Sequence, residues 1–87
     1  MNFSNAKTFK GYFLNTNHFS KKDGSQEYYI ANCLLVDDKS YSIISLNNKE
    51  FYDFAQDYKE LTPVTITAVK TYNVDKKAKY LIQSIDF

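Results

Sequence analysis

The sequence contains no arginine and no tryptophan, and only two glycines, one proline, one cysteine and one histidine. Gly11 and Gly24 alone cannot supply a phosphate-binding loop or a dinucleotide fingerprint, because both need several glycines at fixed spacing. A single cysteine cannot form an internal disulfide, which fits a reducing cytoplasm. No apolar run approaches the roughly 20 residues of a membrane span, and the opening residues do not resemble a signal peptide. We therefore expect a cytoplasmic protein without membrane contact.

Catalytic and metal-binding residues are also scarce. A zinc site built on His18 and Cys33 would need carboxylates at suitable spacing, and none is present. Cys33 lies among apolar residues, which predicts a small buried thiol. Asp37 and Asp38 are adjacent, so on a strand they would point to opposite faces, and a polar turn explains them better. We expect no enzyme, no metal and no cofactor.

The 87 residues predict one domain, residues 1–87, with one modest core. The composition, 44% hydrophobic and 24% charged, is that of a folded globular protein. The net charge of +1 is unevenly distributed: +3 over residues 1–26, −4 over 27–62 and +2 over 63–87. Such asymmetry can produce a positive face on a nearly neutral protein.

Alternating segments rich in aromatic and β-branched residues predict five strands. They cover residues 7–19, 27–36, 41–46, 64–72 and 80–87. Asp23-Gly24 separates the first two strands, because glycine accepts the positive φ of a tight turn. The polar segments 37–40 and 73–79 predict the other hairpin turns.

Between the third and fourth strands the spacing becomes helical. Apolar residues recur in steps of three and four, which places them on one helical face: Phe51, Phe54, Ala55, Tyr58 and Leu61. Asn47, three residues before Glu50, is the expected cap of a capping box. Pro63 follows at a point where the helix has already ended.

This order predicts a mainly β fold, the five-stranded OB barrel, which commonly carries a helix between its third and fourth strands. The RNA-recognition module would need a second helix, and SH3-like barrels usually lack a full helix here. The known OB binding surface uses strands 2 and 3 with the loops joining strands 1–2 and 4–5. The two lysine clusters fall in those loops: Lys21 and Lys22, then Lys76, Lys77 and Lys79.

Strand alternation also predicts which side chains leave the core. If Phe9 and Phe13 face inward, Lys10 and Tyr12 face outward, and the same argument exposes Tyr28 and Tyr41. Lys70 and Tyr72 share the parity of the buried positions of their strand. Exposing Tyr72 therefore requires the last hairpin to bend away from the barrel.

Exposed tyrosines beside lysines suit single-stranded nucleic acid, because bases stack on aromatic rings and lysines contact phosphates. Sequence-specific duplex recognition is disfavoured, since the chain has no arginine and its helix is acidic. We expect a single-stranded nucleic acid as the ligand, with DNA and RNA both open at this point. Eleven residues are the predicted contacts: Lys10, Tyr12, Lys21, Lys22, Tyr28, Tyr41, Lys70, Tyr72, Lys76, Lys77 and Lys79. Two other interpretations stay open: lysine loops that are only solvated surface, and an OB-like module that binds another protein.

The runs "GSQEYYIANCLLVDDKSYSI" and "VTITAVKTYNVDKKAKYLIQSIDF" resemble the small single-stranded DNA-binding proteins of filamentous phages in size, element order and pattern. The resemblance covers roughly residues 9–87. It implies an OB-fold homodimer that coats single-stranded DNA cooperatively in an infected bacterial cell. By position, Tyr28 and Tyr41 resemble the family's strand-2 and strand-3 tyrosines, and Tyr72 lies in the second hairpin. The lack of arginine and the clearer helix fit a relative from a Gram-positive phage or mobile element equally well.

Overall fold

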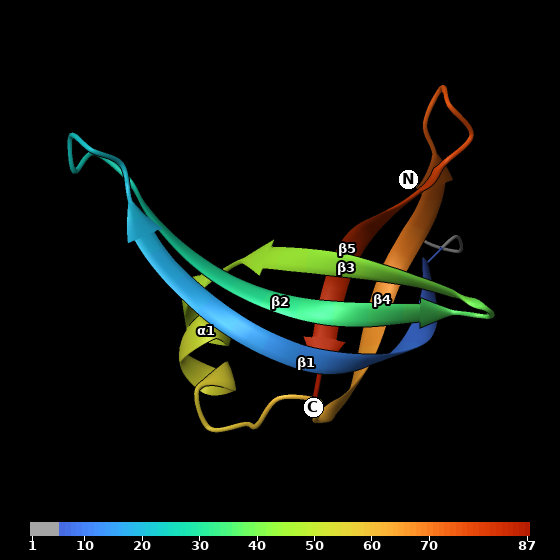
Figure 1. The fold of residues 1–87 in the computed structure, drawn as a ribbon, viewed down its shortest axis with the longest axis horizontal. Coiled ribbons are helices and arrows are strands. Elements are labelled where there is room, and N and C mark those ends of the chain that lie inside the picture. Colours follow the sequence, from blue (N-terminus) through green and yellow to red (C-terminus); the bar gives the residue numbers. More distant parts are fainter. Residues whose placement is uncertain (1–5) are drawn as a thin grey trace.

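The computed structural model describes residues 6–87, which form five antiparallel strands and one short helix (Figure 1). The elements are β1 (Ala6–Ser20), β2 (Glu27–Asp37), β3 (Ser40–Asn47), α1 (Lys49–Ala55), β4 (Pro63–Tyr72) and β5 (Ala78–Asp86). The predicted mainly β fold with an OB-like topology is confirmed. Each predicted strand boundary lies within two residues of the observed one.

The five strands form one curled sheet in the order β3-β2-β1-β4-β5. Because each neighbouring pair is antiparallel, the two edge strands β3 and β5 both run in the direction of β1. Within the described residues no hydrogen-bonded ladder joins β3 to β5. The sheet is therefore a half-barrel that is open along the line between these two strands.

The core fills the inner, concave side of the sheet and is closed at one end by α1. Its fully buried side chains include Cys33, Leu35 and Ile66, from β2 and β4. Burial raises the pKa of the Cys33 thiol to about 11, so this group is uncharged at neutral pH. The predicted buried thiol is thus confirmed, and in residues 6–87 no polar or charged residue is buried.

A bulge at Leu14 divides β1 into two parts with opposite parity. Phe13 pairs with Cys33, whereas Asn15 pairs with Asn32, so one extra residue lies on β1 between the two pairs. A bulge of this kind exchanges the faces of all residues that follow it. Consequently Phe19 lies on the outer face of the sheet, although it has the same odd-numbered parity as the buried Phe13.

The helix is shorter than its pattern predicts, and its cap is one residue later. The Asn48 side chain accepts the Phe51 N–H at 2.9 Å, whereas Asn47 Oδ1 accepts the N–H of Tyr29 on β2. The predicted cap at Asn47 was therefore wrong, because that amide joins β3 to β2 instead.

The predicted apolar face of the helix is also incomplete. Ala55 is buried, but Phe54 and Leu61 are exposed, and the helix ends before Leu61, which has a φ of 68°. Tyr58 lies beyond the helix and stacks on Phe87 with ring centroids 3.8 Å apart. The helical segment therefore packs through a few aromatic contacts rather than along a continuous stripe.

Candidate nucleic-acid interface

The face of β1, β2 and β3 opposite the core brings together four of the predicted residues: Lys10, Tyr12, Tyr28 and Tyr41. We call this surface the outer face. The strand register arranges it in cross-strand rows, which are Lys10–Val36–Tyr41, Tyr12–Leu34–Ile43, Asn15–Asn32–Ser45, Asn17–Ile30–Asn47 and Phe19–Tyr28. Neighbouring residues in one row have their side chains close together, because directly paired Cβ atoms lie about 5 Å apart.

Apart from Lys10, the rows nearest the β2–β3 turn are made of aromatic and aliphatic residues, several of them exposed. Tyr41 and Ile43 on the edge strand β3 are 67% and 71% exposed, and Tyr12 on β1 is exposed as well. Leu34 and Val36 lie between them on β2 and are half-buried. These rows offer flat aromatic and aliphatic surface to a ligand.

The middle of the outer face is a polar row of hydrogen-bonded side chains. Asn32 Nδ2 donates to Asn15 Oδ1 at 2.8 Å, and the Ser45 hydroxyl donates to Asn32 Oδ1. The bonds all run in one direction, so the chain ends at the Asn15 amide nitrogen, which is a donor. The row therefore presents hydrogen-bond donors between two apolar patches.

At the far end of the outer face, Phe19 and Tyr28 stack with ring centroids 5.2 Å apart and an angle of 28° between the rings. This pair leads into the β1–β2 turn, where Lys21 and Lys22 are exposed. Gly24 has a φ of 72°, as the turn signal predicts. An aromatic platform and a basic turn therefore lie side by side.

The inner side of the same hairpin is occupied by a second aromatic cluster. His18 stacks on Tyr29 at 4.3 Å, and Tyr52 of α1 meets both rings edge-on. The Tyr29 hydroxyl donates to Glu27 at 2.7 Å, which raises the pKa of that hydroxyl. His18 thus contributes to packing that supports the hairpin from behind.

The second lysine cluster lies in the β4–β5 turn and at the start of β5, at the opposite end of the molecule from the first (Figure 1). Asn73 Oδ1 accepts the N–H groups of Asp75 and Lys77, each at 3.0 Å, and Lys76 has a φ of 62°. These local contacts shape the turn without using the lysine amines. Lys76, Lys77 and Lys79 are exposed to solvent.

Lys70 and Tyr72 do not lie on the outer face. The Lys70 amine is 2.6 Å from Asp37 Oδ2, and the Tyr80 hydroxyl donates to the same oxygen at 2.7 Å. Tyr72 is 65% exposed, and its ring centroid lies 5.5 Å from the Lys70 amine. Lys70 and Tyr72 therefore lie apart from the predicted contacts on the outer face. Asp37, which was expected only as part of a polar turn, forms an ion pair with Lys70.

Several outer-face residues were missed by sequence reasoning. Ile43 alternates with the buried Ile44, so its exposure could have been predicted from strand parity alone. Phe19 could not, because the bulge at Leu14 reverses the parity of the end of β1. The Asn15–Asn32 contact depends on the same shift in register and had no sequence signal.

Comparisons of the chain with protein families, with curated proteins and with solved structures find no match. The OB-like topology therefore rests on the arrangement of strands and helix described above. No helix within residues 6–87 has the length and apolar character that crossing a membrane requires. The same residues hold no cluster of three or more histidine, cysteine, aspartate or glutamate side chains suited to a metal ion.

Proposed function

We propose that this protein binds single-stranded DNA, largely without sequence specificity, through lysine–phosphate contacts and stacking of bases on tyrosines. The observation that carries the proposal is the shared outer face of four residues: Lys10, Tyr12, Tyr28 and Tyr41. In OB folds this surface of strands 2 and 3, between the loops joining strands 1–2 and 4–5, is where oligonucleotides bind. Both of those loops carry lysines here.

Stacking is the main source of affinity in this proposal. Each base stacked on an aromatic side chain contributes about 1–3 kcal/mol, and every base has a face that can stack. Tyr41 offers an exposed ring at one end of the outer face, and the Phe19–Tyr28 pair offers a second platform at the other end. A strand crossing the outer face can contact both.

The lysine turns hold the phosphates. The β1–β2 and β4–β5 turns lie at opposite ends of the molecule, whose longest dimension is 36 Å. OB folds occupy sites of about 4–16 nucleotides, so both turns can contact one bound strand. Lysines release condensed counterions when they contact phosphates, which makes the affinity dependent on salt.

The resemblance to filamentous-phage proteins adds finer parts to the proposal. They are a homodimer, a place in DNA replication and an origin in a phage or mobile element. RNA is the alternative ligand. The exposed aliphatic side chain of Ile43 beside Tyr41 favours a second candidate function, a module that binds another protein through this face.

A titration with oligo-dT tests the proposal, since tyrosine is the chain's intrinsic fluorophore and stacked bases quench it. The matched variants are Tyr41→Ala, which removes the ring, and Tyr41→Phe, which keeps it. Loss of one stacked base should weaken binding about 5- to 150-fold in the alanine variant, with little change in the phenylalanine variant. If oligo-dT neither quenches the fluorescence nor shifts the protein in a gel at low salt, the nucleic-acid function is rejected.

A further inference from the structure

The edge strand β3 lacks the features that normally protect a sheet edge. Its eight residues, "SYSIISLN", include no charged residue and no proline, and its pairing with β2 is regular, without a bulge. Natural edge strands are usually short, charged, bulged or interrupted by proline, because their unpaired N–H and C=O groups would otherwise pair with another strand. The composition of β3 is that of a strand with a partner on both sides.

The opposite edge, β5, is different. Its register with β4 shifts between Thr67 and Ala68, and it carries the charged residues Lys79 and Asp86. These are the protections that β3 lacks. We therefore expect an added strand to pair with β3, with β5 on the opposite side of the opening.

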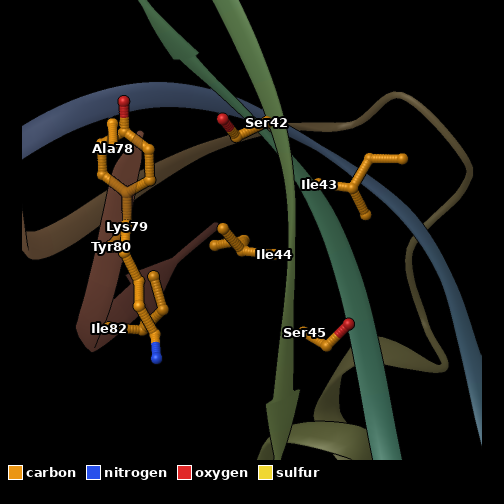
Figure 2. A pocket seen from close by; sticks show the side chains of 8 residues that line it. All are labelled: Ser42, Ile43, Ile44, Ser45, Ala78, Lys79, Tyr80 and Ile82. Atoms are coloured by element: carbon orange, nitrogen blue, oxygen red, sulfur yellow. The ribbon is translucent and has the colours of Figure 1, made fainter. Parts of the chain in front are cut away.

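Between the two strands lies an open cavity of about 450 Å³. Figure 2 shows Ile44 pointing from β3 toward Tyr80 and Ile82 of β5, whereas Ile43 points away from them. The bottom of the cavity is therefore apolar, and its β3 side is a row of backbone groups. Its volume is within the range of about 300–1,000 Å³ typical of small ligand pockets.

Lysines lie in and near the cavity. Lys79 lines it, Lys76 and Lys77 lie in the turn just before β5, and Lys39 directly precedes β3. Because β3 and β5 run parallel, their first residues lie at the same end of the opening. These lysines favour carboxylates on whatever binds there.

We propose that the opening between β3 and β5 binds an extended acidic segment of another protein. The segment adds a strand to β3, and backbone hydrogen bonds provide the affinity, as in other cases of strand addition. Alternate apolar side chains contact Ile44, Tyr80 and Ile82, since successive side chains of a strand point to opposite faces. Its carboxylates contact these lysines. This interaction does not use the outer face, but it shares Lys76, Lys77 and Lys79 with the proposed function.

The probe is a blocked nine-residue peptide of alternating valine and glutamate, with a valine–lysine peptide of equal length as its matched control. Amide hydrogen exchange, followed by NMR on the ¹⁵N-labelled protein, reports the pairing directly. At a peptide concentration ten times Kd, exchange of the solvent-facing β3 amides should slow about tenfold. The valine–lysine peptide should give no such protection.

The charge contribution is tested with Lys79→Glu, an exposed position where folding is not at risk, and Lys59→Glu serves as the control of equal charge change. Lys79→Glu should weaken binding of the valine–glutamate peptide, and Lys59→Glu should leave this binding unchanged. The proposal is overturned if neither peptide protects β3, or if both do so equally. It is also overturned if β3 is protected without peptide in a concentration-dependent dimer, detected by sedimentation, or if oligo-dT produces the same protection.

Discussion

The Lys70 amine and the Asp37 carboxylate form an ion pair, 2.6 Å long, that joins β4 to the end of β2. The Tyr80 hydroxyl of β5 donates to the same carboxylate oxygen, so three strands meet at one atom. The side chains of Lys70 and Asp37 keep 31% and 21% of their exposure, so solvent screens the pair only in part. The contact fixes the base of the β4–β5 hairpin relative to the β2–β3 turn.

This contact predicts an acid-sensitive component of stability. Hydrogen bonds from Lys70 and then Tyr80 lower the pKa of the Asp37 carboxyl below its ordinary value. A depressed folded-state pKa stabilises the protein above the unfolded value of about 3.9, and this stabilisation is lost as the pH falls through the folded value. The stability of wild type, measured by thermal unfolding, should therefore fall more steeply below about pH 4 than the stability of Asp37→Asn.

The matched control is Asp38→Asn, which changes the adjacent exposed carboxylate outside this cluster. Its dependence on pH should follow that of wild type. Parallel curves for Asp37→Asn and wild type between neutral and acid pH would contradict the role given to Asp37. At alkaline pH the stabilisation is lost as the pH rises, because the hydrogen bond to the Asp37 carboxylate raises the pKa of Lys70. The pair's contribution is then complete below the unfolded lysine value of about 10.4 and is lost as the pH rises through the folded value.

Gly11 is predicted to be required for packing rather than for backbone conformation. A Cβ atom at this position would lie 2.5 Å from Ile66 Cδ1 and 2.6 Å from the backbone oxygen of Leu34. The carbonyl belongs to the β1–β2 ladder and cannot move aside without breaking it. Gly11→Ala should lower the free energy of unfolding by about 1–3 kcal/mol, measured by urea denaturation. Gly24→Asn is the control, because Gly24 has open space around it and asparagine tolerates positive φ; equal stability of all three proteins would exclude this account.

The fold could be predicted from sequence because strand alternation, the Asp23-Gly24 turn and the helical spacing of residues 51–61 agree on one element order. The cap was misplaced by one residue, since the spacing from Asn47 to Glu50 matches a capping box although Asn48 is the residue that caps the helix. Only the end of β3 determines which of them faces the helix. The opening between β3 and β5 is also invisible in the pattern, because pairing between distant strands depends on the curvature of the whole sheet.

The candidate site was predictable in part for the same physical reason. Tyr12 and Tyr41 follow simple alternation from buried neighbours, and the structure places both on the outer face. The position of Lys70 could not be read from its own segment, because its partner Asp37 lies on β2, which is 33 residues earlier in the chain. Phe19 needed knowledge of a bulge. Local patterns therefore predicted on which face of the sheet a side chain lies. The partners of side chains and the register of the strands could be seen only in the folded structure.

The lysines of the β4–β5 turn are predicted to contribute to binding through phosphate contacts. For single strands, each contact adds about −0.7 to the slope of log affinity against log salt concentration. Replacing both Lys76 and Lys77 with alanine should therefore flatten the slope by about 1.4, measured by tyrosine quenching with oligo-dT. Lys59→Ala, in the acidic segment after α1, should leave the slope unchanged. A wild-type slope in the double variant would remove this turn from the interface.

The polar row predicts a modest preference among bases. Its hydrogen bonds run from Ser45 through Asn32 to Asn15, so the row ends in the Asn15 amide donor, which can bond the carbonyl acceptors of thymine. Asn15→Asp replaces that donor with acceptors alone and should lower the ratio of oligo-dT to oligo-dA affinity about two- to tenfold, the loss expected for one hydrogen bond. Asn17→Asp adds the same charge two residues along the outer face, outside the row. It should lower the affinity for both oligonucleotides equally and leave the ratio of oligo-dT to oligo-dA affinity unchanged. Fluorescence titrations of the three proteins at one salt concentration measure this, and an equal ratio in all three would show that the row does not read bases.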